Sequence, residues 1–161
     1  MLAGILGGSV ILSAGAASPC LVGPPAAVYA GDFNGDGRPD RAWFVPFQAL
    51  GRAWVDDPWT GFRHEVKAGA PVLVMALGGQ LPREARCRLI QNPRFFSTPI
   101  WAEEPRPVRV LAGRAVEAAG WRLRYRRWQG DALLLATEAG PEILLFWDGR
   151  RFRIGRSREV P

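Results

Sequence analysis

Oxygen-bearing side chains alternate along one short stretch near the start of the chain, G-D-F-N-G-D-G-R-P-D at residues 31–40. Numbered from its first aspartate, the stretch places donors at positions 1, 3, 5 and 9 and a backbone carbonyl at position 7: Asp32, Asn34, Asp36, Asp40 and the carbonyl of Arg38. A tightly coiled backbone can point donors with this spacing at one centre, and hard oxygen donors in that number suit Ca²⁺ better than a transition metal. The spacing therefore predicts one structural Ca²⁺ in this segment, which we call the acidic loop.

The acidic loop also has an interpretation without a metal. Asn34-Gly35 and Asp36-Gly37 are common tight-turn dipeptides, and aspartate favours turns because its side chain hydrogen-bonds to nearby backbone. However, three carboxylates within nine residues repel one another unless a cation neutralises them. We therefore favour the Ca²⁺ site over a metal-free hairpin turn.

The surroundings of the acidic loop separate it from an EF-hand. Position 12, where an EF-hand needs a bidentate glutamate, is Trp43, and a strand pattern rather than a helix pattern follows the loop. With aspartate at position 9 and strands on both sides, the loop resembles the calcium-binding turn of FG-GAP and VCBS-type repeats. The resemblance covers residues 28–46, and no second copy of the motif occurs in the chain, so a propeller is not implied.

A second motif lies near the end of the chain. Residues 147–152 contain the pattern W-D-G-x-x-F, formed by Trp147, Asp148, Gly149 and Phe152. Together with the acidic loop and a central cysteine, this pattern resembles small exported bacterial proteins of unknown function. The resemblance implies a fold and a compartment, and it implies no activity.

The first residues predict export. Residues 2–17 carry no charge and end in small residues, as a signal peptide does, so we expect a signal at 1–17 and a single β-rich domain at 18–161. The two cysteines, Cys20 and Cys87, then predict one disulfide in a periplasmic or secreted protein. Lipidation of Cys20 is disfavoured because Pro19 precedes it, but the sequence leaves it open. No membrane span is expected after the signal is removed.

The balance of charge does not indicate a nucleic-acid binder. The chain of 161 residues has a net charge of +6, but it contains no recognisable nucleic-acid-binding motif, and we therefore expect no nucleic-acid partner. An envelope protein or an anionic polymer remains the partner to consider.

Strand patterns recur along the whole chain and helical patterns are few. Strands are expected at 28–32, 41–47, 71–77, 83–91, 108–111, 121–126, 131–137, 142–147 and 151–154, with a two-residue turn closing the last hairpin. The apolar run 71–77 predicts a central strand buried on both faces, whereas 48–70 and 92–107 are expected to be connections anchored by aromatic residues, and 113–119 one or two helical turns. The pattern predicts an all-β or β-rich α+β fold, in which a mainly antiparallel meander sheet curls into a sandwich or open barrel.

Residues suited to catalysis are scarce. His64 is the only histidine, and no nucleophile motif accompanies it. One histidine and two cysteines expected to be oxidised cannot build a closed zinc site. The adjacent carboxylates Asp56-Asp57 and Glu103-Glu104 point in opposite directions on a strand and are more typical of solvated charge. We therefore expect no enzyme and no catalytic residues.

The leading interpretation is an exported, non-catalytic binding or scaffold module of the bacterial envelope, stabilised by one Ca²⁺ in the acidic loop. The alternative is an inhibitor or ligand-binding protein that engages an anionic or carbohydrate partner. Its contact surface would be the aromatic segment 54–62 or the arginines that alternate along the expected strand 121–126: Arg122, Arg124 and Arg126. A solvated outer face of a sheet explains the same arginine pattern without a partner.

Overall fold

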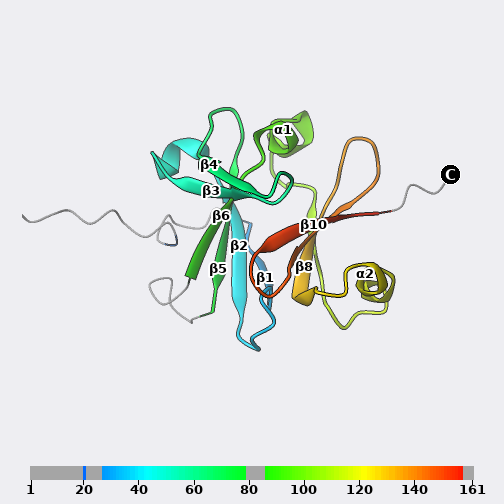
Figure 1. The fold of residues 1–161 in the computed structure, drawn as a ribbon. Helices are drawn as coiled ribbons and strands as arrows, with labels where there is room; N and C mark the ends of the chain where they lie inside the picture. The colour runs from blue at the N-terminus through cyan, green and yellow to red at the C-terminus, as the bar shows by residue number, and fades with distance from the viewer. Residues whose placement is uncertain (1–19, 21–26, 79–85, 158–161) are drawn as a thin grey trace, which may run out of the picture.

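The computed structural model describes residues 20, 27–78 and 86–157, which form two packed β-sheets (Figure 1). The first sheet has six strands in the order β1-β2-β5-β6-β3-β4: β1 (Tyr29–Gly31), β2 (Asp40–Val45), β3 (Trp54–Asp57), β4 (Phe62–Glu65), β5 (Val72–Leu77) and β6 (Arg86–Ile90). The second sheet is a four-stranded meander in the order β10-β9-β8-β7: β7 (Val108–Leu111), β8 (Gln129–Leu135), β9 (Ile143–Trp147) and β10 (Phe152–Arg156). The β-rich, mainly antiparallel fold predicted from the sequence is confirmed, and its form is a sandwich without a closed barrel.

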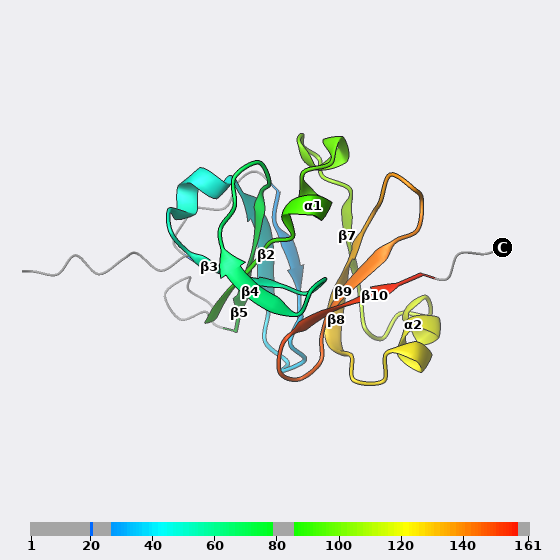
Figure 2. The same ribbon diagram turned by 45° about the horizontal axis from the view of Figure 1, so that its top comes forward.

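The pairing within the sheets is antiparallel with one exception. β3 joins β6 in parallel at Asp56 and Ile90, and the other pairings among the described strands are antiparallel. Within the described ranges, four short helical segments connect the strands: η2 (Phe47–Leu50), α1 (Pro93–Phe96), η3 (Pro99–Trp101) and α2 (Ala118–Arg124). Figure 2 shows α1 near the top of the sandwich and α2 against the outer side of the second sheet.

The main core lies between the two sheets. It combines side chains from both sheets with the aromatic residues of the α1–η3 segment, among them Phe44, Phe96 and Trp101. The prediction that the aromatics of residues 92–107 anchor this connection to the body is therefore confirmed, since Phe96 and Trp101 are fully buried. Phe33 of the acidic loop is 1% exposed and belongs to the same core, so the loop is fastened to the sandwich by its own side chain.

Both sheets are also covered on their outer faces. Val72, Val74 and Ala76 of β5 pack into a second apolar cluster, while Leu73 and Met75 of the same strand face the central core. All six residues of β5 are buried, which confirms the prediction of a central strand with two buried faces. The outer face of the second sheet is covered by α2 in a third cluster.

The structure corrects the predicted strand at 121–126. Residues 121–124 belong to α2, in which Ala118 is buried and Leu123 is 78% exposed. Tyr125 follows as the C-cap residue and stacks on Trp121 with ring centroids 6.1 Å apart. Positions 118, 121 and 125 recur at helical spacing, so the same residues satisfy a helix as well as an alternating strand. Packing of that helical stripe on the second sheet decides between the two.

Two further expectations about the chain are wrong. The predicted connection 48–70 contains the β3–β4 hairpin, whose strands have only four residues each and whose exposed positions weaken the strand pattern. The final hairpin closes through a four-residue turn, Asp148 to Arg151, because Trp147 pairs with Phe152. Asp148 accepts hydrogen bonds from the amides of Arg150 and Arg151, each at 2.9 Å, and these bonds favour the longer turn.

The two cysteines lie as the sequence predicts. Cys20 and Cys87 form a disulfide with a Cα–Cα distance of 5.6 Å, against the outer cluster of the first sheet. The expected signal segment 1–17 lies outside the described residues. None of the helices that the structure describes has the length and apolar character needed to cross a membrane.

Candidate functional site

The acidic loop connects β1 to β2 as a compact coil whose aspartates accept hydrogen bonds from its own backbone. The carboxylate of Asp32 accepts from the amides of Asp36 and Gly37, both at 3.0 Å. The side-chain oxygen of Asn34 accepts from the amide of Asp36 at 3.0 Å, and Asp36 accepts from the amide of Arg38 at 2.8 Å. The side-chain oxygens at positions 1, 3 and 5 therefore all face the same turn of backbone.

Asp40 closes the coil from a buried position. It is 1% exposed and accepts hydrogen bonds from the amides of Gly78 at 2.6 Å and Asn34 at 3.2 Å. Burial raises the pKa of Asp40 above its ordinary value, the hydrogen bonds from backbone amides oppose that shift, and the nearby charge of Asp36 adds to it. A buried carboxylate beside a second carboxylate is a position where a cation would be stabilising.

The structure does not gather the loop carboxylates into a cage of three or more metal-holding groups, and no such group of histidine, cysteine, aspartate or glutamate occurs in the described part of the chain. The carboxylate oxygens instead meet amide groups of the loop. Each carboxylate oxygen has more than one lone-pair site, so a bond to an amide leaves acceptor capacity for an ion. Donor type and spacing thus fit Ca²⁺.

A residue that the sequence analysis missed attaches the acidic loop to the second sheet. Asp131, in β8, accepts from the amide of Asp32 at 2.9 Å and from the amide of Gly113 at 2.8 Å. Its own amide donates to the carbonyl of Asp32 at 2.7 Å. Asp131 lies 99 positions from Asp32, and no local pattern links the two. The start of the acidic loop is therefore bonded to both its own sheet and the opposite one.

Close backbone contact at this attachment requires glycine. Gly130 has φ +65°, and a Cβ there would overlap the carbonyl oxygen of Asp32 and lie 2.6 Å from the amide nitrogen of Gly35. Gly35 has φ +73°, and a Cβ there would lie 2.9 Å from the amide nitrogen of Gly130. β8 is irregular at this point, because its pairing with β9 shifts register between Gln129 and Leu133. The bulge thus provides the surface on which the loop rests.

Arg122 stabilises the same attachment from α2. Its guanidinium donates to the carbonyls of Gly113 at 2.6 Å, Trp128 at 3.0 Å and Gly130 at 3.1 Å. It also lies 4.4 Å from the centroid of the Trp128 ring. These three carbonyls accept hydrogen bonds from Nε and from both terminal nitrogens of the guanidinium, which are the groups that would bind an anion. Arg122 therefore has a structural role.

The predicted row of Arg122, Arg124 and Arg126 is therefore not formed. Arg124 donates to the carbonyl of Arg156 at 2.7 Å and lies near the ring of Tyr125, whereas Arg126 is exposed on the segment after α2. The three side chains do not share a face, because α2 replaces the expected strand. Arg124 and Arg126 are exposed, whereas Arg122 is half-buried.

The residues considered for catalysis have other contacts. The ring nitrogens of His64 lie 2.7 Å from the carbonyl oxygen of Glu65 and 3.2 Å from that of Gln91. Asp56 pairs with Arg63 at 3.1 Å, whereas Asp57 is buried and accepts from the amide of Trp59 and the side chain of Asn92. Glu104 pairs with Arg106. None of these described groups combines a free base with a nucleophile.

Comparison with models of known protein families, with curated proteins and with solved structures gave no match. The geometry of the described residues therefore carries the functional argument.

Proposed function

We propose that this chain is an exported, non-catalytic binding module of the bacterial envelope whose acidic loop binds one Ca²⁺. The observation that supports the proposal is the position of the loop: its first aspartate, Asp32, is hydrogen-bonded to Asp131 of the opposite sheet, and its last, Asp40, is buried at the start of β2. An ion held between those ends would stabilise the junction of the two sheets. Its role would then be structural.

The proposed ligands come from one coil of backbone. Asp32, Asn34 and Asp36 would supply side-chain oxygens, Arg38 its carbonyl oxygen and Asp40 the buried carboxylate. Three aspartates bring three negative charges to a divalent ion, and this charge balance favours Ca²⁺ over a neutral turn. Isolated loops of this kind in extracellular modules bind weakly, with Kd of about 10⁻⁴ to 10⁻³ M.

Export and the absence of catalysis are supported by separate features. The disulfide between Cys20 and Cys87 suits an oxidising compartment, where such bonds persist. Carbonyl oxygens contact both ring nitrogens of His64, which leaves that ring no free position to act as a base. Binding rather than turnover is thus the function that these groups support.

Calcium binding can be tested by thermal unfolding of the purified protein with 10 mM Ca²⁺ and with EGTA. A Kd near 10⁻⁴ M would stabilise the fold by about 2.7 kcal/mol at about one hundred times Kd, which corresponds to a rise in Tm of roughly 5 to 10 °C for a domain of this size. Isothermal calorimetry at the same concentration should show one site.

Two variants separate the site from general charge effects. Asp36→Asn removes a ligand charge at an exposed position and should abolish the rise in Tm. Glu138→Gln removes one negative charge from an exposed position beyond the other end of β8 and should keep the full rise. If Ca²⁺ produces neither heat nor a change in Tm in the parent protein, the acidic loop is a metal-free turn and the proposal fails.

A further inference from the structure

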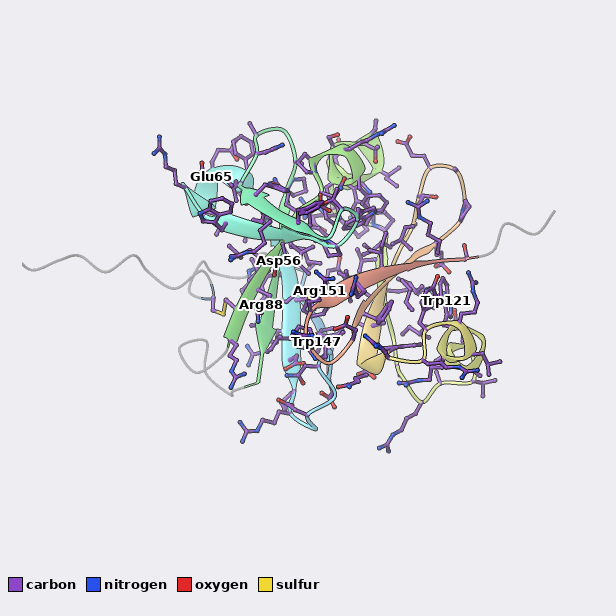
Figure 3. All side chains as sticks on the ribbon, viewed as in Figure 1. Asp56, Glu65, Arg88, Trp121, Trp147 and Arg151 are labelled. Atoms are coloured by element: carbon purple, nitrogen blue, oxygen red, sulfur yellow. A yellow bond between two sulfur atoms is a disulfide. The ribbon has the colours of Figure 1, made fainter. Side chains whose placement is uncertain are left out.

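Three adjoining depressions on the surface gather eight of the chain's 21 lysine and arginine residues. The first, of about 290 Å³, lies between the β3–β4 hairpin and β10 and is lined by Arg63, Arg88, Arg151 and Arg153. Figure 3 shows Arg88 and Arg151 near Asp56 where the first sheet meets β10. The two sheets therefore contribute arginines to one depression.

The second and third depressions continue from the first. The second, of about 380 Å³, is lined by Arg127 and Arg150 in addition to Arg151 and Arg153. The third, of about 390 Å³, adds surface arginines from the end of α2 and the residues after it, Arg124 and Arg126. Arg153 lines all three depressions, so they form one continuous surface, which we call the basic furrow.

The basic furrow is strongly and locally positive. Its lining contains eight arginines and three aspartates, a surplus of five charges, while the whole chain has a surplus of six. Two of the aspartates are paired within the furrow, Asp56 with Arg63 at 3.1 Å and Asp148 with Arg153 at 2.8 Å. Within the described residues no carboxylate forms an ion pair with the other six arginines. Arg124 and Arg151 each donate to one backbone carbonyl, that of Arg156 and that of Gly61, and the donors that remain on the six guanidinium groups can pair with a ligand's anionic groups.

The turn in the middle of the basic furrow is held in place before any ligand binds. Asp148 accepts hydrogen bonds from the amides of Arg150 and Arg151 and from the Nε of Arg153 at 2.8 Å. A guanidinium nitrogen of Arg151 also reaches the carbonyl of Gly61, in the β3–β4 turn, at 3.4 Å. A ligand would therefore meet arginines on a fixed backbone, which lowers the entropy lost on binding.

We propose that the basic furrow binds a linear acidic polysaccharide. A single small anion would fill one depression, whereas three connected depressions with arginines along their length suit a polymer that repeats its carboxylates. Arginine pairs with carboxylate through two parallel hydrogen bonds. Phe62, which is 76% exposed, lines the first depression and Tyr125 lines the third, and aromatic rings offer apolar faces to sugar rings. The disulfide suits the oxidising compartment in which such glycans occur.

This inference shares export with the proposed function but does not depend on calcium, because the acidic loop does not line the basic furrow. Binding is therefore measured in EGTA, which also prevents Ca²⁺ from bridging the polymer to the protein. Loss of calcium binding with retained polysaccharide binding would overturn only the proposed function, and the reverse result would overturn only this inference.

The probe is a fluorescently labelled ten-residue oligogalacturonate, and binding is followed by anisotropy in low salt. The triple variant R127Q/R150Q/R151Q should weaken binding at least tenfold. The matched control R52Q/R94Q/R114Q removes the same charge from exposed arginines outside the basic furrow and should change the affinity less than threefold. Equal losses of affinity in the two triple variants would show that the polymer binds through the protein's net charge alone, and the assignment of the basic furrow as the binding site would be overturned.

Two other probes test the ligand class with the parent protein, independently of the folding of any variant. The methyl-esterified oligogalacturonate has the same sugar chain without carboxylate charges and should not bind. A ten-residue oligothymidylate presents phosphates and bases instead of uronates, and it should bind more weakly than the oligogalacturonate. Equal binding of the ester, or tighter binding of the oligothymidylate, would overturn the assignment to an acidic polysaccharide.

Discussion

The acidic loop and the basic furrow are held by the fold in opposite ways. In the acidic loop the charged groups are turned toward the chain itself, since Asp32, Asp36 and Asp40 accept hydrogen bonds from backbone amides. In the basic furrow the backbone is fixed by Asp148, and most arginines extend from it without a carboxylate partner. Charged side chains that are hydrogen-bonded to the protein's own backbone stabilise the fold. Charged side chains that extend into solvent from an ordered backbone are available to a ligand.

The same contrast divides the arginines near α2. Arg122 is surrounded by three carbonyl oxygens at the attachment of the acidic loop, while Arg126, four residues later, is exposed in the basic furrow. Residue type therefore does not distinguish a structural arginine from one available for binding. The number of backbone carbonyls that accept hydrogen bonds from the guanidinium distinguishes the two kinds of arginine.

The largest effect is expected where the acidic loop touches β8. Gly130→Ala would place a Cβ against the backbone of Asp32 and Gly35 at a positive φ, and no flexible side chain is present to move aside. Combining the strain of the left-handed conformation with overpacking, we expect a loss of about 3 kcal/mol in the free energy of unfolding. Urea denaturation followed by circular dichroism measures it.

Gly140→Ala is the matched control for Gly130→Ala. Gly140 also has a positive φ, of +94°, but nothing lies within 4 Å of its added Cβ. Only the backbone strain remains there, so the expected loss is about 1 kcal/mol. Equal losses at the two glycines would mean that the contact between the acidic loop and β8 does not stabilise the fold.

The next effect compares the two arginines. Arg122→Gln removes a charged donor from the carbonyls of Gly113, Trp128 and Gly130, and we expect it to lower the free energy of unfolding by about 2 kcal/mol. Arg126→Gln alters an exposed side chain and should stay within about 0.5 kcal/mol. Chemical denaturation of both variants checks the difference. If Arg122→Gln leaves the free energy of unfolding unchanged, Arg122 is no more structural than Arg126.

Sequence reasoning succeeded where the determinants are local. The apolar run of β5, the strands on both sides of the acidic loop and the pairing of Cys20 with Cys87 were all predicted, because each depends on composition or on short spacing. The acidic loop itself was located from alternation within ten residues. Its occupation by Ca²⁺ stays a prediction.

Sequence reasoning failed where distant segments decide the outcome. Residues 121–126 fit both a strand and a helix, and packing against the second sheet selects the helix. Asp131 became part of the candidate site only through its contacts with Asp32 and Gly113. The basic furrow joins arginines from both sheets and from the residues after α2, so its members share no spacing in the sequence.

Apart from the control variants, the smallest expected effect concerns the aspartate that fixes the basic furrow. Burial favours the neutral form of Asp148, but hydrogen bonds from Arg153 and from the amides of Arg151 and Arg150 outweigh it and hold the pKa below its ordinary value. A carboxyl with a lowered pKa stabilises the folded state above the unfolded-state pKa of about 3.9, and that contribution is lost as the pH falls through the folded-state value. Asp148→Asn should therefore cost about 1 kcal/mol at pH 6.

The pH dependence distinguishes this electrostatic contribution from a simple change of shape. The difference in free energy of unfolding between the parent and Asp148→Asn should narrow below pH 4, because the parent's carboxyl then becomes neutral as well. Urea unfolding at pH 6, 4 and 3 measures that difference, and the other carboxyls cancel because both proteins carry them. A difference that stays constant across this range would mean that Asp148 fixes the turn by shape alone, and the arginines of the basic furrow would then keep their positions without its charge.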